Sequence, residues 1–201
     1  MFTGIIEAVS RVNRVKRTGR ALQLEVAKPR NWRISAGASI AVNGVCSTAI
    51  LAGRRLGFHY MPGTLKVTAL SRLRIGDRVN LERSLPVSGR WEGHFVYGHI
   101  DAIGTVSNLT RRRGETKIQI TLPANATAPG WLITRGAIAL NGVSLTIFSL
   151  SKKGFTVAIT PFTKKHTALG LLPVGDRVNL EFDQLAKIVS ACCRESPRFK
   201  K

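Results

Sequence analysis

The amino-acid sequence predicts an all-β fold of two homologous small closed barrels, followed by a helix near the C-terminus. Three observations predict it: three sequence blocks recur in order, each half has a two-residue hydrophobic period, and a helical period follows the second half. The chain has 201 residues, and 44% of them are hydrophobic. This is enough for two packed domains of about 100 residues each, and it excludes a disordered chain.

The repeat sets the expected domain boundaries. Residues 76–82 read GDRVNLE, and residues 175–181 repeat them letter for letter. Two further blocks, at residues 40–48 and 62–70, recur with substitutions at residues 138–146 and 161–169. Because all three blocks keep their order and nearly the same offset, the halves are homologous domains. The expected organisation is an N-terminal barrel over 1–94, a C-terminal barrel over 95–184, and an association helix with a basic tail over 185–201.

Within each half, the local pattern is typical of β-strands. Residues 22–26 and 117–122 alternate hydrophobic and polar side chains, as strands with one buried face do. The pairs at 43–44 and 141–142 are Asn-Gly, which fits tight turns because both residues tolerate positive φ. Closing such a sheet leaves no free edge, so small domains can be stable without disulfides.

The C-terminal segment predicts a helix. Asp183 can cap it, and Leu185, Ile188, Val189 and Cys192 share one helical face. We expect such an apolar stripe to be buried against another protein surface. Two alternatives remain open: packing against its own barrel, or association with other subunits.

Composition excludes several classes of protein. The net charge is +20, which fits either a solvated basic surface or a polyanion-binding surface. Because only 6% of the residues are aromatic and could stack on bases, nucleic-acid binding is not expected. No apolar run reaches the roughly 20 residues of a membrane helix, and the first residues lack the pattern of a signal peptide, so we expect a cytoplasmic protein with no membrane partner. The three cysteines and four histidines show no zinc spacing, and no metal site is expected.

Two segments and the repeats together resemble the riboflavin synthase family. Residues 1–7 read MFTGIIE, and residues 93–101, at the domain junction, read GHFVYGHID. With the doubled Asn-Gly-Val-Cys/Ser and GDRVNLE blocks, the resemblance extends over residues 1–190.

The resemblance implies an architecture and an activity. It implies two six-stranded antiparallel barrels and a homotrimer assembled through the C-terminal helices. The family acts in riboflavin biosynthesis as a transferase: two molecules of 6,7-dimethyl-8-ribityllumazine dismutate into riboflavin and 5-amino-6-ribitylamino-uracil by transfer of a four-carbon unit, without a cofactor. The productive site would lie between the first barrel of one chain and the second barrel of a neighbour. The basic surface is compatible with an association with lumazine synthase.

The two halves differ at a position where catalysis needs asymmetry. Cys46 in the first half corresponds to Ser144 in the second. A thiol can ionise near neutral pH and a hydroxyl cannot, so Cys46 is the better candidate nucleophile or base. His99 can move a proton near neutral pH. The resemblance adds Ser39 and Asn141 to these catalytic candidates. The alternatives are a small core side chain for Cys46 and a hydrogen-bonded surface group for His99.

The resemblance also implies a substrate-binding set. In the first barrel it comprises Gly4, Ile5, Ile6, Cys46, Ser47, Thr48, Tyr60, Met61, Pro62, Gly63, Thr64, Gly98, His99 and Ile100. In the second barrel it comprises Arg135, Ser144, Leu145, Thr146, Ile159, Thr160, Pro161, Phe162 and Thr163. Asp183 joins Thr64 and Thr163 as a candidate partner of the ribityl chain.

Some residues depart from the family pattern. Asn141 stands where the family usually has an acid, and an amide cannot hold a proton as a carboxylate can. Gly63 and Phe162 stand where an acid or His is common, Lys164 where an apolar residue is usual, and Ser47 where Leu is common. A second hypothesis therefore stays open: a lumazine- or flavin-binding protein of the antenna type, without catalysis. A third, a barrel that binds single-stranded nucleic acid, would explain the charge but not the repeats.

Overall fold

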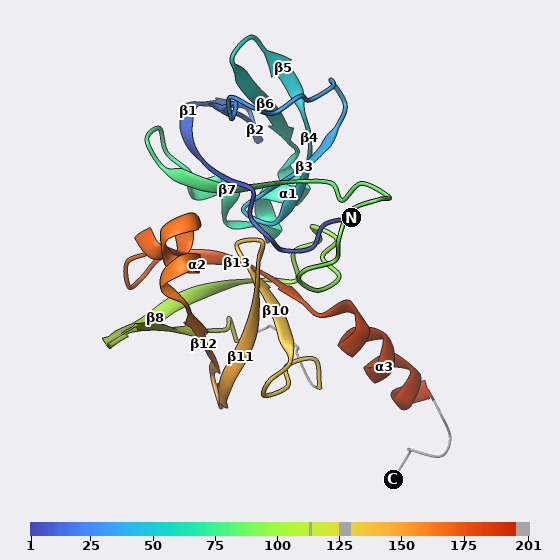
Figure 1. Cartoon of the computed structure of the whole chain (residues 1–201), viewed down its shortest axis with the longest axis vertical. Coiled ribbons are helices and arrows are strands. Elements are labelled where there is room, and N and C mark those ends of the chain that lie inside the picture. The colour runs from blue at the N-terminus through green and yellow to red at the C-terminus, as the bar shows by residue number, and fades with distance from the viewer. Residues whose placement is uncertain (113, 125–129, 196–201) are drawn as a thin grey trace.

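The computed structural model describes residues 1–112, 114–124 and 130–195, and it consists of two β domains stacked along the long axis, with a helix that projects from the second (Figure 1). The N-terminal domain contains β1 (Ala8–Thr18), β2 (Ala21–Ala27), β3 (Ser39–Val42), β4 (Val45–Thr48), β5 (Ile50–Ala52), β6 (Arg55–Tyr60), α1 (Pro62–Val67), η1 (Ala69–Arg72) and β7 (Arg78–Arg83). The C-terminal domain contains β8 (Ala102–Arg112), β9 (Glu115–Thr121), β10 (Ala137–Leu140), β11 (Val143–Ser151), β12 (Gly154–Ile159), α2 (Pro161–His166), η2 (Ala168–Leu171) and β13 (Arg177–Phe182), and α3 (Gln184–Glu195) follows.

The predicted two-residue period is present in both domains. In β2, Leu22, Leu24 and Val26 are buried, and in β9 Ile118 and Ile120 are buried. Each set of inward side chains belongs to a separate hydrophobic core, one for each domain. The sequence-based expectation of two β domains plus a C-terminal helix is confirmed.

The two sheets differ in how they close. In the C-terminal domain the order β10-β11-β12-β9-β8-β13 forms a closed barrel of six strands, as expected. In the N-terminal domain a seven-stranded sheet has β4 and β5 at its two edges, separated along the chain by Ala49. Ala49 and its counterpart Ile147 make the same bonds: Ala49 N donates to Ala38 O at 2.8 Å, and Ile147 N donates to Gly136 O at 2.9 Å. The strand therefore turns the same corner in both domains, but in the first domain the sheet is interrupted there.

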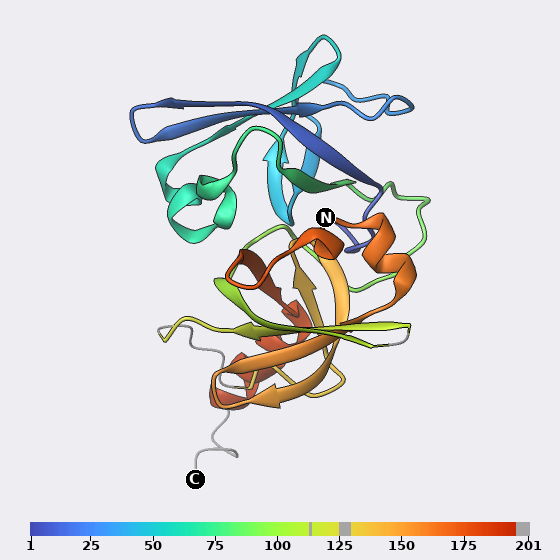
Figure 2. The ribbon, with the colours of Figure 1, turned by 90° about the vertical axis from the view of Figure 1, so that its left-hand side faces the viewer.

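Buried asparagines join the two domains by reciprocal hydrogen bonds. Asn80 Nδ2 donates to Asn141 O at 2.9 Å, and Asn179 Nδ2 donates to Asn43 O at 2.8 Å. The side-chain oxygen of Asn80 also accepts the backbone N–H of Ala168, the first residue of η2 in the other domain. In the same way, the side-chain oxygen of Asn179 accepts the N–H of Ala69, the first residue of η1. This symmetry gives the two halves one fixed relative orientation, seen from a second direction in Figure 2.

Helix α3 leaves the second barrel with its apolar stripe uncovered. Lys187 Nζ lies 2.8 Å from Asp101 Oδ1, which anchors the first turn to the start of β8. Leu185, Ile188 and Val189 are 54%, 49% and 61% exposed. Within the described part of the chain, packing on its own barrel therefore does not cover this stripe. No helix among the described residues is long and apolar enough to cross a membrane.

Candidate functional site

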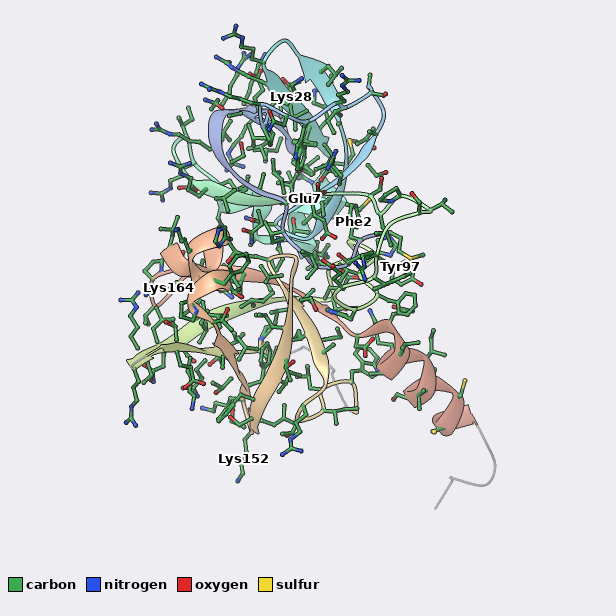
Figure 3. The ribbon with its side chains drawn as sticks, in the orientation of Figure 1. Phe2, Glu7, Lys28, Tyr97, Lys152 and Lys164 are labelled. Atoms are coloured by element: carbon green, nitrogen blue, oxygen red, sulfur yellow. The ribbon has the colours of Figure 1, made fainter. Side chains whose placement is uncertain are left out.

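The segment that leads into each half crosses over to the barrel of the other half. Phe2 and Val96 form an antiparallel bridge between the two segments. Beyond this bridge, Cys46 N donates to Gly98 O at 3.0 Å, and Ser144 N donates to Gly4 O at 2.8 Å. Figure 3 shows Phe2, Glu7 and Tyr97 at the boundary between the domains. Each of the two equivalent positions, Cys46 and Ser144, is therefore paired with a segment from the other half.

This crossing corrects one expectation. Gly4 lies against Ser144 of the second barrel, not in the first-barrel pocket to which the family resemblance assigns it. Ile6 follows it and packs against the C-terminal core, whereas Ile100 packs against the N-terminal core. Gly98 lies against Cys46, as expected. A repeat establishes which residues are equivalent but not which barrel each leading segment contacts.

Buried glutamates hold both crossing segments. Glu82 accepts the N–H groups of Thr3 and Gly4 at 2.6 and 3.0 Å. Glu181, the equivalent residue, accepts those of Tyr97 and Gly98 at 2.6 and 2.9 Å. Burial raises the pKa of both carboxyls, that of Glu181 to about 7, although these backbone hydrogen bonds oppose the rise.

Close packing requires glycine in both segments. The φ values of Gly4 and Gly98 are +79° and +81°, a region that favours glycine. A Cβ on Gly98 would lie 2.6 Å from Cys46 Cβ, and one on Gly4 would lie 2.6 Å from Ser144 Cβ. The backbone carbonyl of each glycine can therefore approach the strand closely enough to form the hydrogen bond.

The outer faces of β4 and β11 present the predicted polar groups. Cys46 and Thr48 are exposed on β4, and Thr146 is exposed on β11 next to the partly buried Ser144. Because Cys46 is exposed, its alternative interpretation as a core side chain does not hold. His99, next to Gly98 on the crossing segment, is also exposed. Cys46 and Gly98, which His99 follows in sequence, are therefore one candidate half-site, and Ser144, Gly4 and Thr146 are the other.

Strand alternation corrects the expectation for four candidate side chains. Ser47 and Tyr60 are buried, and their hydroxyl oxygens lie 2.9 Å apart. Leu145 and Ile159 are buried in the C-terminal core. Successive side chains of a strand point to opposite faces, so neighbours of exposed site residues face the barrel interior. These four side chains can support the site from behind but do not line its surface.

Asn141 belongs to the domain interface. Its Oδ1 accepts the N–H of Asn179 at 2.8 Å, its backbone oxygen accepts from Asn80, and it is 5% exposed. Its φ of +46° is the turn conformation that the Asn-Gly pair predicts. Both side-chain and backbone acceptors of Asn141 thus hold the domains together. Its assignment to the catalytic groups stays a prediction.

The remaining candidates occupy strand ends and corners. Ser39 is exposed opposite Thr48, and together with Ile5 it lines a groove of about 610 Å³. Arg135 is exposed at a corner with φ +67°, and Asp183 accepts the N–H of Leu185 at the start of α3. The turns into α1 and α2 are mostly exposed and contain Met61, Pro62, Gly63, Thr64, Thr160, Pro161, Phe162 and Thr163. The described contacts do not connect these two turns to Cys46 or Ser144.

One functional candidate was missed in the sequence. His94 Nδ1 lies 2.7 Å from Ser144 Oγ, while Nε2 is buried without a hydrogen-bond partner among the described residues. Burial lowers the pKa of His94 below its usual value, and the carboxylate of Asp183 opposes that change. His94 lies within the junction motif at 93–101, but nothing in the sequence alone indicates that it contacts Ser144.

Comparisons with known proteins agree with this architecture. The family model described as "Lumazine binding domain" matches residues 3–84 and 97–183. A riboflavin synthase of Bacillus amyloliquefaciens is 35% identical over 93% of this chain and 87% of its own length. One of Mycobacterium tuberculosis (strain H37Rv) is 36% identical over 98% of this chain and 100% of its own length.

Solved structures of LumP have the same fold. The complex of LumP with riboflavin gives a TM-score of 0.83 at 25% identity and covers 90% of this chain and 99% of that one. The complex with 6,7-dimethyl-8-(1'-D-ribityl) lumazine gives 0.82 at 24% identity, with coverage of 90% and 98%. The duplicated barrels, the paired half-sites and these relatives together show that the chain belongs to the lumazine-binding domain family, as an enzyme of the riboflavin synthase type.

Proposed function

We propose that the protein dismutates two molecules of 6,7-dimethyl-8-ribityllumazine into riboflavin and 5-amino-6-ribitylamino-uracil by transferring a four-carbon unit. The observation that carries the proposal is a pair of equivalent half-sites with unlike groups, the exposed thiol of Cys46 and the hydroxyl of Ser144 next to His94. The riboflavin synthases among its relatives, at 34–36% identity, support the same conclusion.

The symmetry suits a reaction between two copies of one molecule. Two related half-sites can hold identical heterocycles in a defined relative orientation, which converts a bimolecular encounter into a positioned one. One copy must donate the four-carbon unit and the other must accept it, so identical half-sites would be unsuitable. The chemical difference between Cys46 and Ser144 gives the two copies different environments.

The proposed binding surface uses strand edges and small hydroxyls. In the first half-site, Cys46, Thr48 and His99 present exposed polar groups. In the second, Thr146 is exposed and Ser144 is partly buried, and Asp183 lies close enough to influence His94 electrostatically. Polar groups of this kind can orient a flat ring and a polyol chain. The exposed residues 61–64 and 160–163, with Arg135 and Ser39, would complete the binding surface.

We propose a cytoplasmic homotrimer in which neighbouring chains complete the site. The uncovered apolar stripe of α3, formed by Leu185, Ile188 and Val189, supports association through this helix. A site shared between the first barrel of one chain and the second barrel of another would bring unlike half-sites face to face. The net charge of +20 would favour an acidic partner such as lumazine synthase.

The direct test is to incubate purified protein with 6,7-dimethyl-8-ribityllumazine and to follow flavin absorbance. Flavin formation proportional to enzyme, with one riboflavin formed for each two lumazines consumed, is the expected result. A protein that binds the lumazine but forms no flavin would contradict the proposal.

Such an outcome would favour the second candidate, a binding protein of the antenna type. The observation that favours this candidate is the structural similarity to LumP, whose structures contain the lumazine and riboflavin. A binding titration in the same buffer separates the two candidates, because both require affinity and only one requires turnover.

A further inference from the structure

The contact between His94 and Ser144 distinguishes the two half-sites. The Nδ1–Oγ distance of 2.7 Å is that of a strong hydrogen bond. In the described part of the chain the thiol of Cys46, at the equivalent position, has no hydrogen-bond partner of its own. A hydroxyl is a much weaker acid than a thiol, so it depends far more on an adjacent base to become reactive. His94 therefore stands beside the group that requires a base.

The backbone around His94 keeps the imidazole in place. His94 N donates to Thr3 O at 3.1 Å. A Cβ on the preceding Gly93 would lie 2.0 Å from that same oxygen and 3.1 Å from Ser144 Cβ. Only glycine fits this position, and its close approach brings the next residue against Ser144. The contact thus results from tight packing of two backbone segments rather than from a free surface side chain.

The environment of His94 suits a proton acceptor. Burial disfavours the imidazolium, so the ring is neutral near pH 7 and one nitrogen keeps a free electron pair. The carboxylate of Asp183, the ionisable group that acts on His94 among the described residues, stabilises the imidazolium once it forms. A neutral ring that can become charged when required is what proton transfer needs near neutral pH.

We propose that His94 is a positioning residue that orients the Ser144 hydroxyl and accepts its proton. The ring would be the Nε2–H tautomer, with Nδ1 accepting the Ser144 O–H. When a bound C–H acid gives its proton to Ser144 Oγ, the hydroxyl proton passes to Nδ1. The products are a substrate carbanion and an imidazolium, and the reverse transfers restore both residues. This assignment deepens the proposed function and rests on it for the identity of the C–H acid.

Substitutions that separate hydrogen bonding from proton transfer test the role. In His94→Asn the amide can keep a hydrogen bond to Ser144 but cannot take up a proton; in His94→Ala both are lost. We expect kcat to fall about 10- to 100-fold in both variants, with KM and riboflavin affinity within about twofold of wild type. The lower limb of the wild-type pH–kcat profile should disappear in both variants. The matched control is His59→Ala, an exposed histidine on β6, which should leave all these values unchanged.

A double-mutant cycle shows whether His94 acts through Ser144. If it does, His94→Ala should slow Ser144→Ala no further, so the two effects are not additive. Additive effects, or full activity of His94→Asn, would overturn the proposal. A purely structural role would lower thermal stability or riboflavin affinity in step with kcat, and that result would overturn it as well.

A measurement without turnover keeps this proposal separate from the proposed function. Imidazole ¹⁵N NMR of the full-length protein reads the tautomer directly. The expected state of His94 is Nε2–H, with the Nδ1 resonance shifting in Ser144→Ala. A protein that forms no flavin but has this tautomer would contradict the proposed function alone. An Nδ1–H tautomer would contradict the role of His94, whether or not flavin forms.

Discussion

The residue on which the two half-sites differ most is Cys46. Its exposure on the outer face of β4 and its contact with Gly98 predict that the thiol meets the substrate. We expect Cys46→Ala to lower kcat/KM at least tenfold, equivalent to about 1.4 kcal/mol in the barrier. Steady-state flavin formation measures this. Cys193→Ala is the matched control, since it removes an exposed thiol on α3 that is not part of the apolar stripe, and it should keep the wild-type rate. Equal rates for both variants would remove Cys46 from the site.

Glu181 gives the protein a distinct pH dependence of stability. Its pKa is raised to about 7, mainly by burial, so between the unfolded value near 4.5 and 7 the folded state binds more protons than the unfolded state. The Glu181 contribution to stability is therefore greatest at low pH and is lost as pH rises through this window. Its size is on the order of 3 kcal/mol.

Urea unfolding of the wild type and of Glu181→Gln isolates this contribution. Glu82 and His94 also titrate with shifted pKa values, and they do so in both proteins, so the difference between the two unfolding free energies reports Glu181. We expect the wild type to lose stability relative to the variant from pH 4.5 to pH 7.5. A difference that stays constant across this range would show that Glu181 does not titrate there.

At the scale of single residues, the sequence predicts which residues carry reactive groups better than it predicts the direction in which their side chains point. Cys46, Ser144 and His99 were identified from the repeat and the junction motif. Cys46 and His99 are exposed and Ser144 is partly buried, and their part in the site stays a prediction. Ser47 and Tyr60 face the core instead. The period of two already excludes Ser47 from the face of Cys46, so alternation could have corrected this expectation. His94 could not be predicted, because its contact with Ser144 spans 50 residues of sequence.

At the scale of elements, the crossing segments control the geometry of both half-sites. A Cβ on Gly98 would lie 2.6 Å from Cys46 Cβ, and Gly98 also has positive φ, so Gly98→Ala combines backbone strain with a clash. We expect this variant to displace the segment, lower activity about tenfold or more, and lose about 2–4 kcal/mol of stability. Flavin formation and urea unfolding measure the two effects.

Gly19 provides the control for backbone strain. Its φ is +58°, but no atom lies within 4 Å of a Cβ placed there. Gly19→Ala should therefore cost only about 1 kcal/mol and leave activity unchanged. If Gly98→Ala behaved like Gly19→Ala, close packing of the crossing segment against Cys46 would not matter for the site.

Strands, turns and the closed C-terminal barrel could be predicted from the sequence, but the interruption of the N-terminal sheet could not. The Asn-Gly pairs form the expected turns with positive φ, and β2 and β9 bury the expected residues. The interruption of the N-terminal sheet at Ala49 has no sequence signal, because Ile147 makes the same hydrogen bonds within a continuous strand. Register at a corner depends on side-chain packing that periodicity does not describe.

At the scale of the whole molecule, the duplication of the domain and the difference between its two copies have separate consequences. Reciprocal hydrogen bonds of Asn80 and Asn179 give the halves one fixed relation, and matched glutamates hold the crossing segments. Within this symmetric arrangement, we expect the difference between Cys46 and Ser144 to affect the chemistry without altering the fold. The same arrangement would suit a binding protein, so the unlike half-sites, and not the barrels, carry the argument for catalysis.

Association through α3 is the remaining prediction at this scale. Leu185, Ile188 and Val189 are exposed on one face, and charge on that face would oppose burial between subunits. We expect Ile188→Glu and deletion of residues 185–201 to convert a trimer to smaller species in sedimentation experiments. Both should lose flavin formation if neighbouring chains complete the site. Val87→Glu, which places the same charge at a fully exposed apolar position outside α3, should remain trimeric and active. A deleted chain that sediments as a trimer would show that another surface holds the subunits together.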